Sequence, residues 1–146
     1  MASSAKLGIG AALKIGDGAS PEVFATVANV TQFDISKSAP EVDVTNLQSP
    51  GRRREYIGGL IDGDTITVNF HLDLDSATQN DAAGIIKTMK NGETRNFRLD
   101  WSAMGYTAND IYTFPAVVTA LQVSTTPGEA MSGSFTLREA ATGTWS

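Results

Sequence analysis

The sequence predicts a mainly β fold, a β-sandwich or barrel with one flanking α-helix. Strict alternation of apolar and polar residues, the period of a half-buried strand, recurs in residues 65–73, 96–101 and 131–138. Only residues 77–91 place apolar side chains at helical spacing. The resulting order of strands, one helix and further strands is typical of a helix packed on a β-sheet.

The length of 146 residues matches one compact domain, so we assign residues 1–146 to a single domain. Charged residues make up 18% of the chain, below the roughly 25% typical of soluble domains. The polar surface must therefore consist largely of Thr, Ser, Asn, Gln and Gly. Such a surface is common where neighbouring subunits cover it, but an ordinary low-charge domain has the same composition.

Charge and composition argue against several classes of site. The net charge of −5 does not suit a surface that grips phosphate backbones. The chain has no cysteine, which excludes disulfides and cysteine-ligated metals. No apolar run approaches the ~20 residues of a membrane span, and the first residues lack the apolar stretch of a secretory signal. We expect no cofactor, no membrane insertion and synthesis in a cytoplasm.

The N-terminal third contains several predicted strands. Residues 11–16 form the first of them, and the small residues 1–10 before it predict a flexible N-terminal arm ordered by a partner, or a frayed terminus. Residues 22–35 fit one long bent strand or two short ones. Residues 41–45 alternate strictly, which predicts a half-buried strand.

Residues 46–63 predict a long inter-strand loop, because they have no clear periodicity. Loops of this length are uncommon in compact domains and are usually functional or disordered. Apolar side chains in this loop require cover, either by a partner or by the loop's own domain. They are Leu47, Tyr56, Ile57, Leu60 and Ile61.

The predicted helix begins at Ala77, with Ser76 as its cap and Gln79 completing a capping-box pattern. Residues 91–92, Asn-Gly, predict its end. Its apolar face consists of Ala82, Ile85, Ile86 and Met89. More strands follow, including the apolar segment 111–124.

The residues give little support to catalysis. The single histidine, His71, lies on the polar face of a strand. Asp73 is one possible neighbour, but a solvated or cross-strand histidine is the better interpretation. The acidic pairs at 62–64 and 73–75 do not continue into a calcium-binding loop and fit turns better. We expect a protein that is not an enzyme.

Three segments resemble a known family. Residues 42–46 (VDVTN), residues 49–60 (SPGRRREYIGGL) with Asp62 and Gly63 after them, and the opening residues 13–18 (LKIGDG) closely resemble the major tail-tube proteins of siphophages. The resemblance covers nearly the whole chain. Some relatives carry an extra C-terminal immunoglobulin-like domain, which we do not expect here.

The resemblance implies a structural virion protein that assembles with itself. Homohexameric rings with a continuous β-barrel lumen stack into the tail tube, which conducts double-stranded DNA from capsid to host cell without specific binding. The implied location is the virion tail, assembled in the host cytoplasm. The implied partners are further copies of the chain, a tape measure protein, a tail terminator and tail-tip proteins.

The resemblance further implies that the long loop reaches an adjacent ring. Arginine side chains offer donors to a neighbour's carboxylates or carbonyls, and apolar ones offer anchors. The alternative is a solvated basic turn. The candidate contact residues are Leu47, Arg52, Arg53, Arg54, Glu55, Tyr56, Ile57, Leu60 and Ile61.

An acidic balance suits a channel that passes DNA, since a basic lumen would retain phosphates. Asp73 and Asp100 are candidate lumen residues, but strand parity does not decide their side.

Two alternative functions remain. One is the inner tube of a contractile tail or a secretion-type tube. The other is a carbohydrate- or ligand-binding β-sandwich, for which we would expect more exposed aromatic residues than Trp101, Tyr106, Tyr112 and Trp145.

Overall fold

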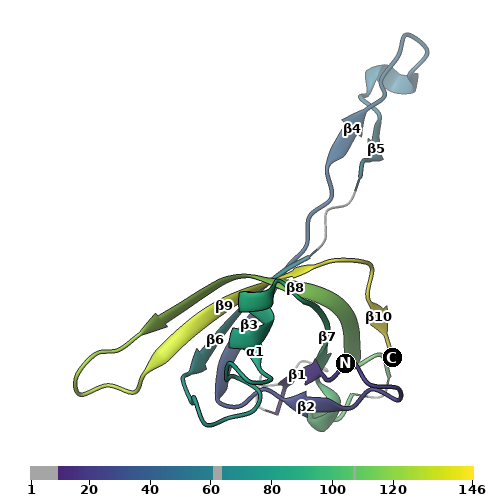
Figure 1. Ribbon diagram of the computed structural model, residues 1–146. Helices are drawn as coiled ribbons and strands as arrows, with labels where there is room; N and C mark the ends of the chain where they lie inside the picture. Colours follow the sequence, from purple (N-terminus) through teal and green to yellow (C-terminus); the bar gives the residue numbers. More distant parts are fainter. Residues whose placement is uncertain (1–9, 61–63, 107) are drawn as a thin grey trace.

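The computed structural model describes residues 10–60, 64–106 and 108–146, and it confirms the mainly β fold with one flanking α-helix. A curved antiparallel sheet has the strand order β2-β1-β7-β8-β9-β6-β3, with β10 paired to β8 (Figure 1). Its strands are β1 (Ala12–Gly16), β2 (Phe24–Thr26), β3 (Val30–Ser36), β6 (Thr65–His71), β7 (Thr94–Asp100), β8 (Ile111–Ser124), β9 (Ser132–Glu139) and β10 (Thr144–Trp145). The sheet is not closed, because β2 and β3 are its two edges.

The concave face of this sheet holds the core. Alternate side chains point inward as predicted: Ile66, Val68 and Phe70 of β6 are at most 4% exposed. Aromatic rings pack across neighbouring strands, with Phe97 and Phe114 centroids 6.2 Å apart. The other buried apolar residues are Leu13, Ile15, Val27, Ile85, Leu99, Tyr112, Ala116, Val118, Phe135 and Leu137.

Residues 22–35 form two short strands rather than one. β2 and β3 lie at opposite edges of the sheet, since β2 pairs with β1 and β3 pairs with β6. Residues 1–9, which include most of the predicted N-terminal arm, lie outside the described residues.

Asp100 has a structural role at the end of β7. Its carboxylate lies 3.0 Å from Lys14 Nζ and accepts hydrogen bonds from the Ser102 amide and hydroxyl. Burial alone raises the pKa of Asp100, but the bonds from Ser102 and Lys14 outweigh it and hold this pKa below its ordinary value. The side chain of Asp100 is therefore largely buried and paired within its own chain.

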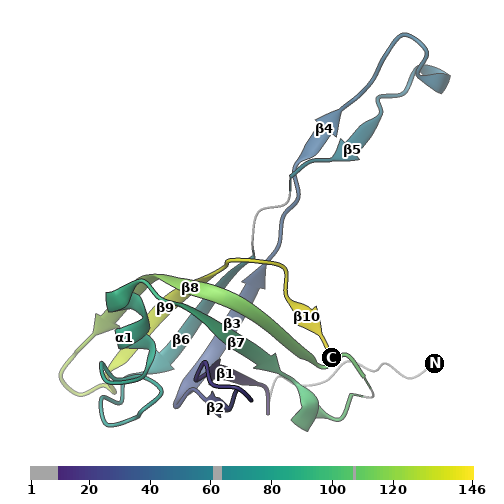
Figure 2. The same ribbon diagram turned by 45° about the vertical axis from the view of Figure 1, so that its right-hand side comes forward.

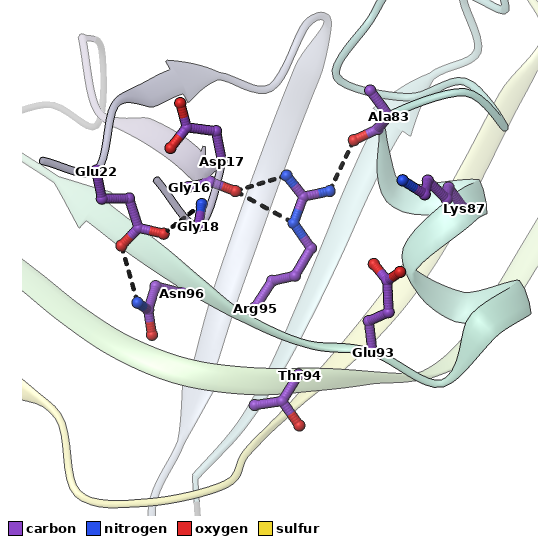
Figure 3. A pocket seen from close by; sticks show the side chains of 10 residues that line it. All are labelled: Gly16, Asp17, Gly18, Glu22, Ala83, Lys87, Glu93, Thr94, Arg95 and Asn96. Atoms are coloured by element: carbon purple, nitrogen blue, oxygen red, sulfur yellow. Dashed lines mark hydrogen bonds between the residues drawn. The ribbon is translucent and has the colours of Figure 1, made fainter. Parts of the chain in front are cut away.

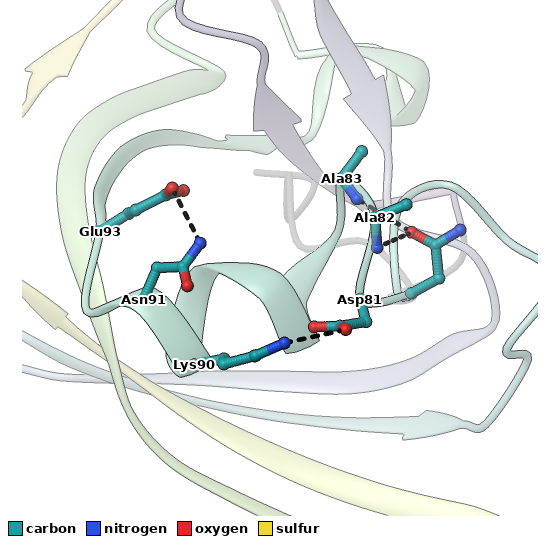
Figure 4. Close-up of polar contacts among 7 residues, drawn as sticks. Asp81, Ala82, Ala83, Lys90, Asn91 and Glu93 are labelled. Carbon is teal, nitrogen blue, oxygen red and sulfur yellow. Dashed lines mark hydrogen bonds and ion pairs between the residues drawn. The ribbon is translucent and has the colours of Figure 1, made fainter.

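The predicted start of the helix is wrong. α1 (Ile85–Asn91) begins eight residues after Ala77, and residues 77–84 form successive turns instead. Gly84 precedes the helix in an extended conformation, where a Cβ would lie 2.4 Å from the backbone nitrogen of Gln79. The Lys90 ammonium bonds Asp81 at 3.2 Å and ties these turns to the helix (Figure 4). The end is as predicted, at left-handed Gly92.

Gln79 explains the late start. Its side chain is buried and is used for tertiary bonds rather than a capping box. The amide nitrogen donates to the Ala28 carbonyl at 2.6 Å and to the His71 carbonyl at 3.2 Å, and the amide oxygen accepts from the Asp73 N–H at 2.9 Å. One side chain therefore fixes the turn between β2 and β3, the end of β6 and the segment that leads into α1.

We expect Gln79→Leu to lower the free energy of unfolding by about 3 kcal/mol and the melting temperature by about 10 °C, because buried backbone groups lose their partners. Urea and thermal denaturation followed by circular dichroism measure both. Gln32→Leu, on the exposed face of β3, is the matched control and should shift stability by less than about 0.5 kcal/mol. Equal effects of the two changes would refute this role of Gln79.

Candidate functional site

A hairpin projects from the body of the protein, and we call residues 40–60 the arm (Figures 1 and 2). It contains β4 (Glu41–Asp43), β5 (Tyr56–Gly58) and the 3₁₀ turn η1 (Pro50–Arg52). All residues of β4 and β5 are exposed, so the prediction of a half-buried strand at 41–45 is wrong. Both faces of this two-stranded ribbon point away from the core. The segment expected to be a loop thus contains a strand of its own.

The arm carries large apolar side chains that nothing in the described chain covers. Leu47 is 99% exposed and Leu60 is 93% exposed. Val42, Val44, Tyr56 and Ile57 are also exposed on the same ribbon. Soluble monomers rarely present so much apolar surface in one place, and such patches mark interaction sites. The remaining apolar candidate, Ile61, lies outside the described residues.

The tip of the arm is held by its own hydrogen bonds. The Asn46 N–H donates to Ser49 Oγ at 2.9 Å, and the Ser49 N–H donates to the Asn46 carbonyl at 3.0 Å. The Ser49 hydroxyl in turn donates to the Glu55 carboxylate at 2.8 Å, and the Glu55 N–H donates to Thr45 Oγ1 at 2.8 Å. This network closes the turn around Leu47, so the tip presents that side chain in a defined direction.

The predicted arginine cluster lies at this tip. Arg52, Arg53 and Arg54 are exposed, and no ion pair joins them to any residue that the structure describes. Glu55 is half-buried because it closes the tip. The sequence-predicted contact residues that are described thus share one projecting element, with Glu55 inside it and the others on its surface.

A polar cluster that is buried except for Lys37 lies at the base of the arm, where the chain leaves β3 and returns to β6. Lys37 Nζ lies 2.9 Å from Asp64 Oδ2 and 4.9 Å from the centre of the Tyr112 ring. Glu139 accepts hydrogen bonds from the Tyr112 hydroxyl, from the Asp64 N–H at 3.2 Å and from the Gly143 N–H at 2.8 Å. Asp64 and Glu139 are 7% and 9% exposed. Burial, reinforced by Glu139, raises the pKa of Tyr112.

Sequence reasoning missed this cluster. Its members come from four separate segments, and only the sheet brings them together: β6 pairs with β9, and β9 pairs with β8. Sequence reasoning counted Tyr112 among the aromatic residues that could be exposed, whereas the structure buries it. No local pattern marks Glu139 as its partner.

The edges and one end of the sheet offer further contact surface. β2 and β3 each have one backbone edge without a neighbouring strand among the described residues. Such edges pair readily with other strands. The β8–β9 hairpin extends beyond the body on one side, where Val123 is 42% and Met131 is 41% exposed (Figure 1).

A polar pocket of about 600 Å³ lies between the β1–β2 turn, α1 and β7, and its polar groups bond one another (Figure 3). The Arg95 guanidinium donates to the carbonyls of Gly16 and Ala83. The Glu22 carboxylate accepts from the Gly18 N–H and the Asn96 side chain. These bonds tie three elements together, so the pocket is part of the scaffold.

Three other features of the described residues were candidates for a site: acidic clusters, apolar helices and the histidine. No group of three or more His, Cys, Asp or Glu in the described ranges is arranged to hold a metal ion. No helix in the described part of the chain is long and apolar enough to cross a membrane. His71 is exposed at the end of β6.

No family model and no curated protein matches this chain. Solved structures do match. A chain from the tail of an empty gene transfer agent (GTA) particle, computed with C6 symmetry, is 22% identical with a TM-score of 0.78, and the match covers 97% of this chain and 99% of that one. The SPP1 tail tube chain is 14% identical with a TM-score of 0.73, over 96% of this chain and 79% of that one.

A chain from a contractile machine is similar as well. The PVC sheath/tube terminator of an extracellular contractile injection system is 12% identical with a TM-score of 0.61, over 96% of each chain. Each match covers at least 96% of this chain. The chain therefore has the fold of the tail and tail-tube structures of phage-like particles.

Proposed function

We propose that this chain is the tail-tube subunit of a noncontractile, siphophage-type tail. In this proposal six copies form a ring, and rings stack into a tube. The arm is the observation that carries the proposal, because its apolar side chains are exposed in the single chain and require a covering surface. Stacking supplies that surface in every ring.

The open sheet supports ring formation. If the β2 edge of one subunit meets the β3 edge of the next, the six sheets join into one continuous barrel with no exposed edge. Such an interface uses two different surfaces of identical subunits, and it closes when each step rotates by one sixth of a turn. The C6 symmetry of the similar GTA tail is consistent with this number.

The proposed role of the tube is to conduct double-stranded DNA from the capsid to the host cell, with no catalytic step by this chain. The net charge of −5 favours passage without retention. The proposed partners are neighbouring copies, a tape measure protein, a tail terminator and tail-tip proteins. Assembly in the host cytoplasm and residence in the virion tail complete the proposal.

A second candidate is the inner tube of a contractile or secretion-type machine. The similarity to the PVC terminator favours it, although the TM-score of 0.61 is lower than the 0.78 and 0.73 of the GTA and SPP1 chains. A contractile machine requires a sheath protein around its tube. Mass spectrometry of native particles that contain this chain distinguishes the two, because a stoichiometric sheath protein would favour the contractile candidate.

The primary test is assembly of the purified chain. We expect negative-stain electron microscopy to show six-fold rings or tubes as the protein concentration rises, and analytical ultracentrifugation to show growth beyond a single ring. A chain that stays monomeric at high concentration, both alone and with tail-tip proteins, would refute the proposed function.

The arginines at the tip provide a charge test. Changing Arg52, Arg53 and Arg54 together to Glu should leave the melting temperature within a few degrees, because all three are exposed, but should block tube elongation. Changing the same three residues to Lys keeps the charge and serves as the control. Tubes of normal length from the Glu variant would remove these residues from the contact between rings.

A further inference from the structure

A second apolar feature lies on the body, apart from the arm. An open pocket of about 330 Å³ lies beside β10, and we call it the aromatic pocket. Trp145 and Tyr106 in its wall are 45% and 40% exposed, whereas Tyr112, whose ring packs against Trp145, is buried. The lining residues are Trp101, Tyr106, Ala108, Asn109, Asp110 and Trp145.

The two tryptophan walls of this pocket are held in place by the fold. The rings of Trp101 and Trp145 stack with centroids 5.8 Å apart, and Trp145 packs on Tyr112 at 4.8 Å. The backbone N–H of Trp101 donates to the Asp110 carbonyl at 2.8 Å, and β10 is fixed to β8 by its strand pairing. A cavity that exists before binding requires little ordering when a ligand enters, which favours binding.

We propose that the aromatic pocket receives Leu47 from the arm of a second copy of this chain. This inference rests on the proposed tube, since it assigns the surface that the arm contacts. Leu47 is the most exposed large apolar residue described, and the pocket has room for such a side chain, with a volume of about ten water molecules. A leucine buried among aromatic rings is a typical interface anchor.

The charges around the two surfaces are complementary. The arm tip carries three exposed arginines, Arg52 to Arg54, and the one neighbouring carboxylate, Glu55, is half-buried and accepts a hydrogen bond from Ser49. The pocket lining includes Asp110 and no lysine or arginine. When Leu47 enters the pocket, the arginines a few residues away come close to this acidic rim. Pairing across the rim favours the correct register of the contact and makes it sensitive to salt.

The geometry requires another copy. In both views the arm extends away from the body, so its tip does not cover the pocket of its own chain (Figures 1 and 2). Each subunit therefore offers one projecting side chain, Leu47, and one aromatic pocket on different surfaces. Such a head-to-tail contact repeats without limit along an axis, as the stacking of rings requires.

Cross-linking tests this contact directly, because the natural chain has no cysteine. Leu47→Cys and Asn109→Cys variants are mixed, assembled and oxidised with copper phenanthroline. We expect a disulfide-linked dimer on a non-reducing gel, since a disulfide requires Cα atoms within about 7 Å. The control pairs Leu47→Cys with Asp81→Cys, an exposed site beside α1, and should give no dimer. A dimer in the mixture of Leu47→Cys with Asp81→Cys, and none in the mixture with Asn109→Cys, would overturn the proposal.

Tryptophan fluorescence gives an independent measurement, because both tryptophans of the chain line the pocket. Assembly should shift their emission to shorter wavelength as Leu47 displaces water. Leu47→Ala should raise the concentration needed for half-maximal assembly at least about tenfold, whereas Gln48→Ala, the neighbouring exposed residue, should leave it unchanged.

The outcomes separate the inference from the proposed function. If the unchanged chain forms no rings or tubes, the proposed function fails and the inference fails with it. If tubes form with neither the Leu47–Asn109 cross-link nor a fluorescence shift, the function stands and the pocket contact is refuted. If tubes form with the fluorescence shift but without the cross-link, another segment occupies the pocket, and the assignment of Leu47 is wrong.

Discussion

Replacement of residues 40–60 by a short Gly-Ser linker is expected to abolish tube elongation and to leave the sheet folded. The arm contributes no side chain to the core, and the replacement keeps Lys37 and Asp64, which anchor its base. We therefore expect a melting temperature within a few degrees of that of the unchanged chain. Circular dichroism measures the fold, and electron microscopy measures the tubes.

The two surfaces proposed for assembly respond differently to this change. The β2 and β3 edges remain, so single rings are the largest species expected, with their size measured by analytical ultracentrifugation. Gln48→Ala, which keeps the arm, should form tubes of ordinary length. Long tubes from the variant without the arm would show that other surfaces stack the rings and would disprove the role proposed for the arm.

The fold was predictable wherever a local pattern reflects a local cause. Alternation along β6 identified the inward residues, because one face of that strand meets the core and the other does not. The end of α1 was predictable since Gly92 supplies a left-handed C-terminus within one turn. The start was not, because the position of Gln79 depends on the carbonyls of Ala28 and His71, which are distant in sequence.

The arm shows a second limit of local patterns. Residues 41–45 alternate as a half-buried strand does, but the structure exposes both faces. Alternation reports that one face requires cover; it does not tell whether the same chain supplies that cover. The apolar residues of segment 46–63 likewise indicated a need for cover, by a partner or by the loop's own domain, and the described chain does not supply it. The pocket proposed to receive Leu47 had no sequence signal, because its walls come from separate segments around Trp101 and Trp145.

The largest effect on stability is expected at the base of the arm. Glu139→Ala should lower the free energy of unfolding by about 3–5 kcal/mol, a large part of the 5–15 kcal/mol typical of a domain. The change leaves the buried Tyr112 hydroxyl, the buried Asp64 N–H and the half-buried Gly143 N–H without their acceptor. Urea denaturation at pH 7 measures the loss, and an unchanged midpoint would contradict it.

Tyr112→Phe is the matched control, because it removes one of the three donors and keeps Glu139 with the other two. Its expected cost is about 1 kcal/mol at pH 7. Since burial and Glu139 raise the pKa of Tyr112, the unfolded chain releases this proton first as the pH rises above about 10. The stability that the protonated phenol contributes is complete below that pH and falls above it. The unchanged chain should therefore lose stability more steeply between pH 9 and pH 11 than Tyr112→Phe does, and equal slopes would show that this hydroxyl is not held by Glu139.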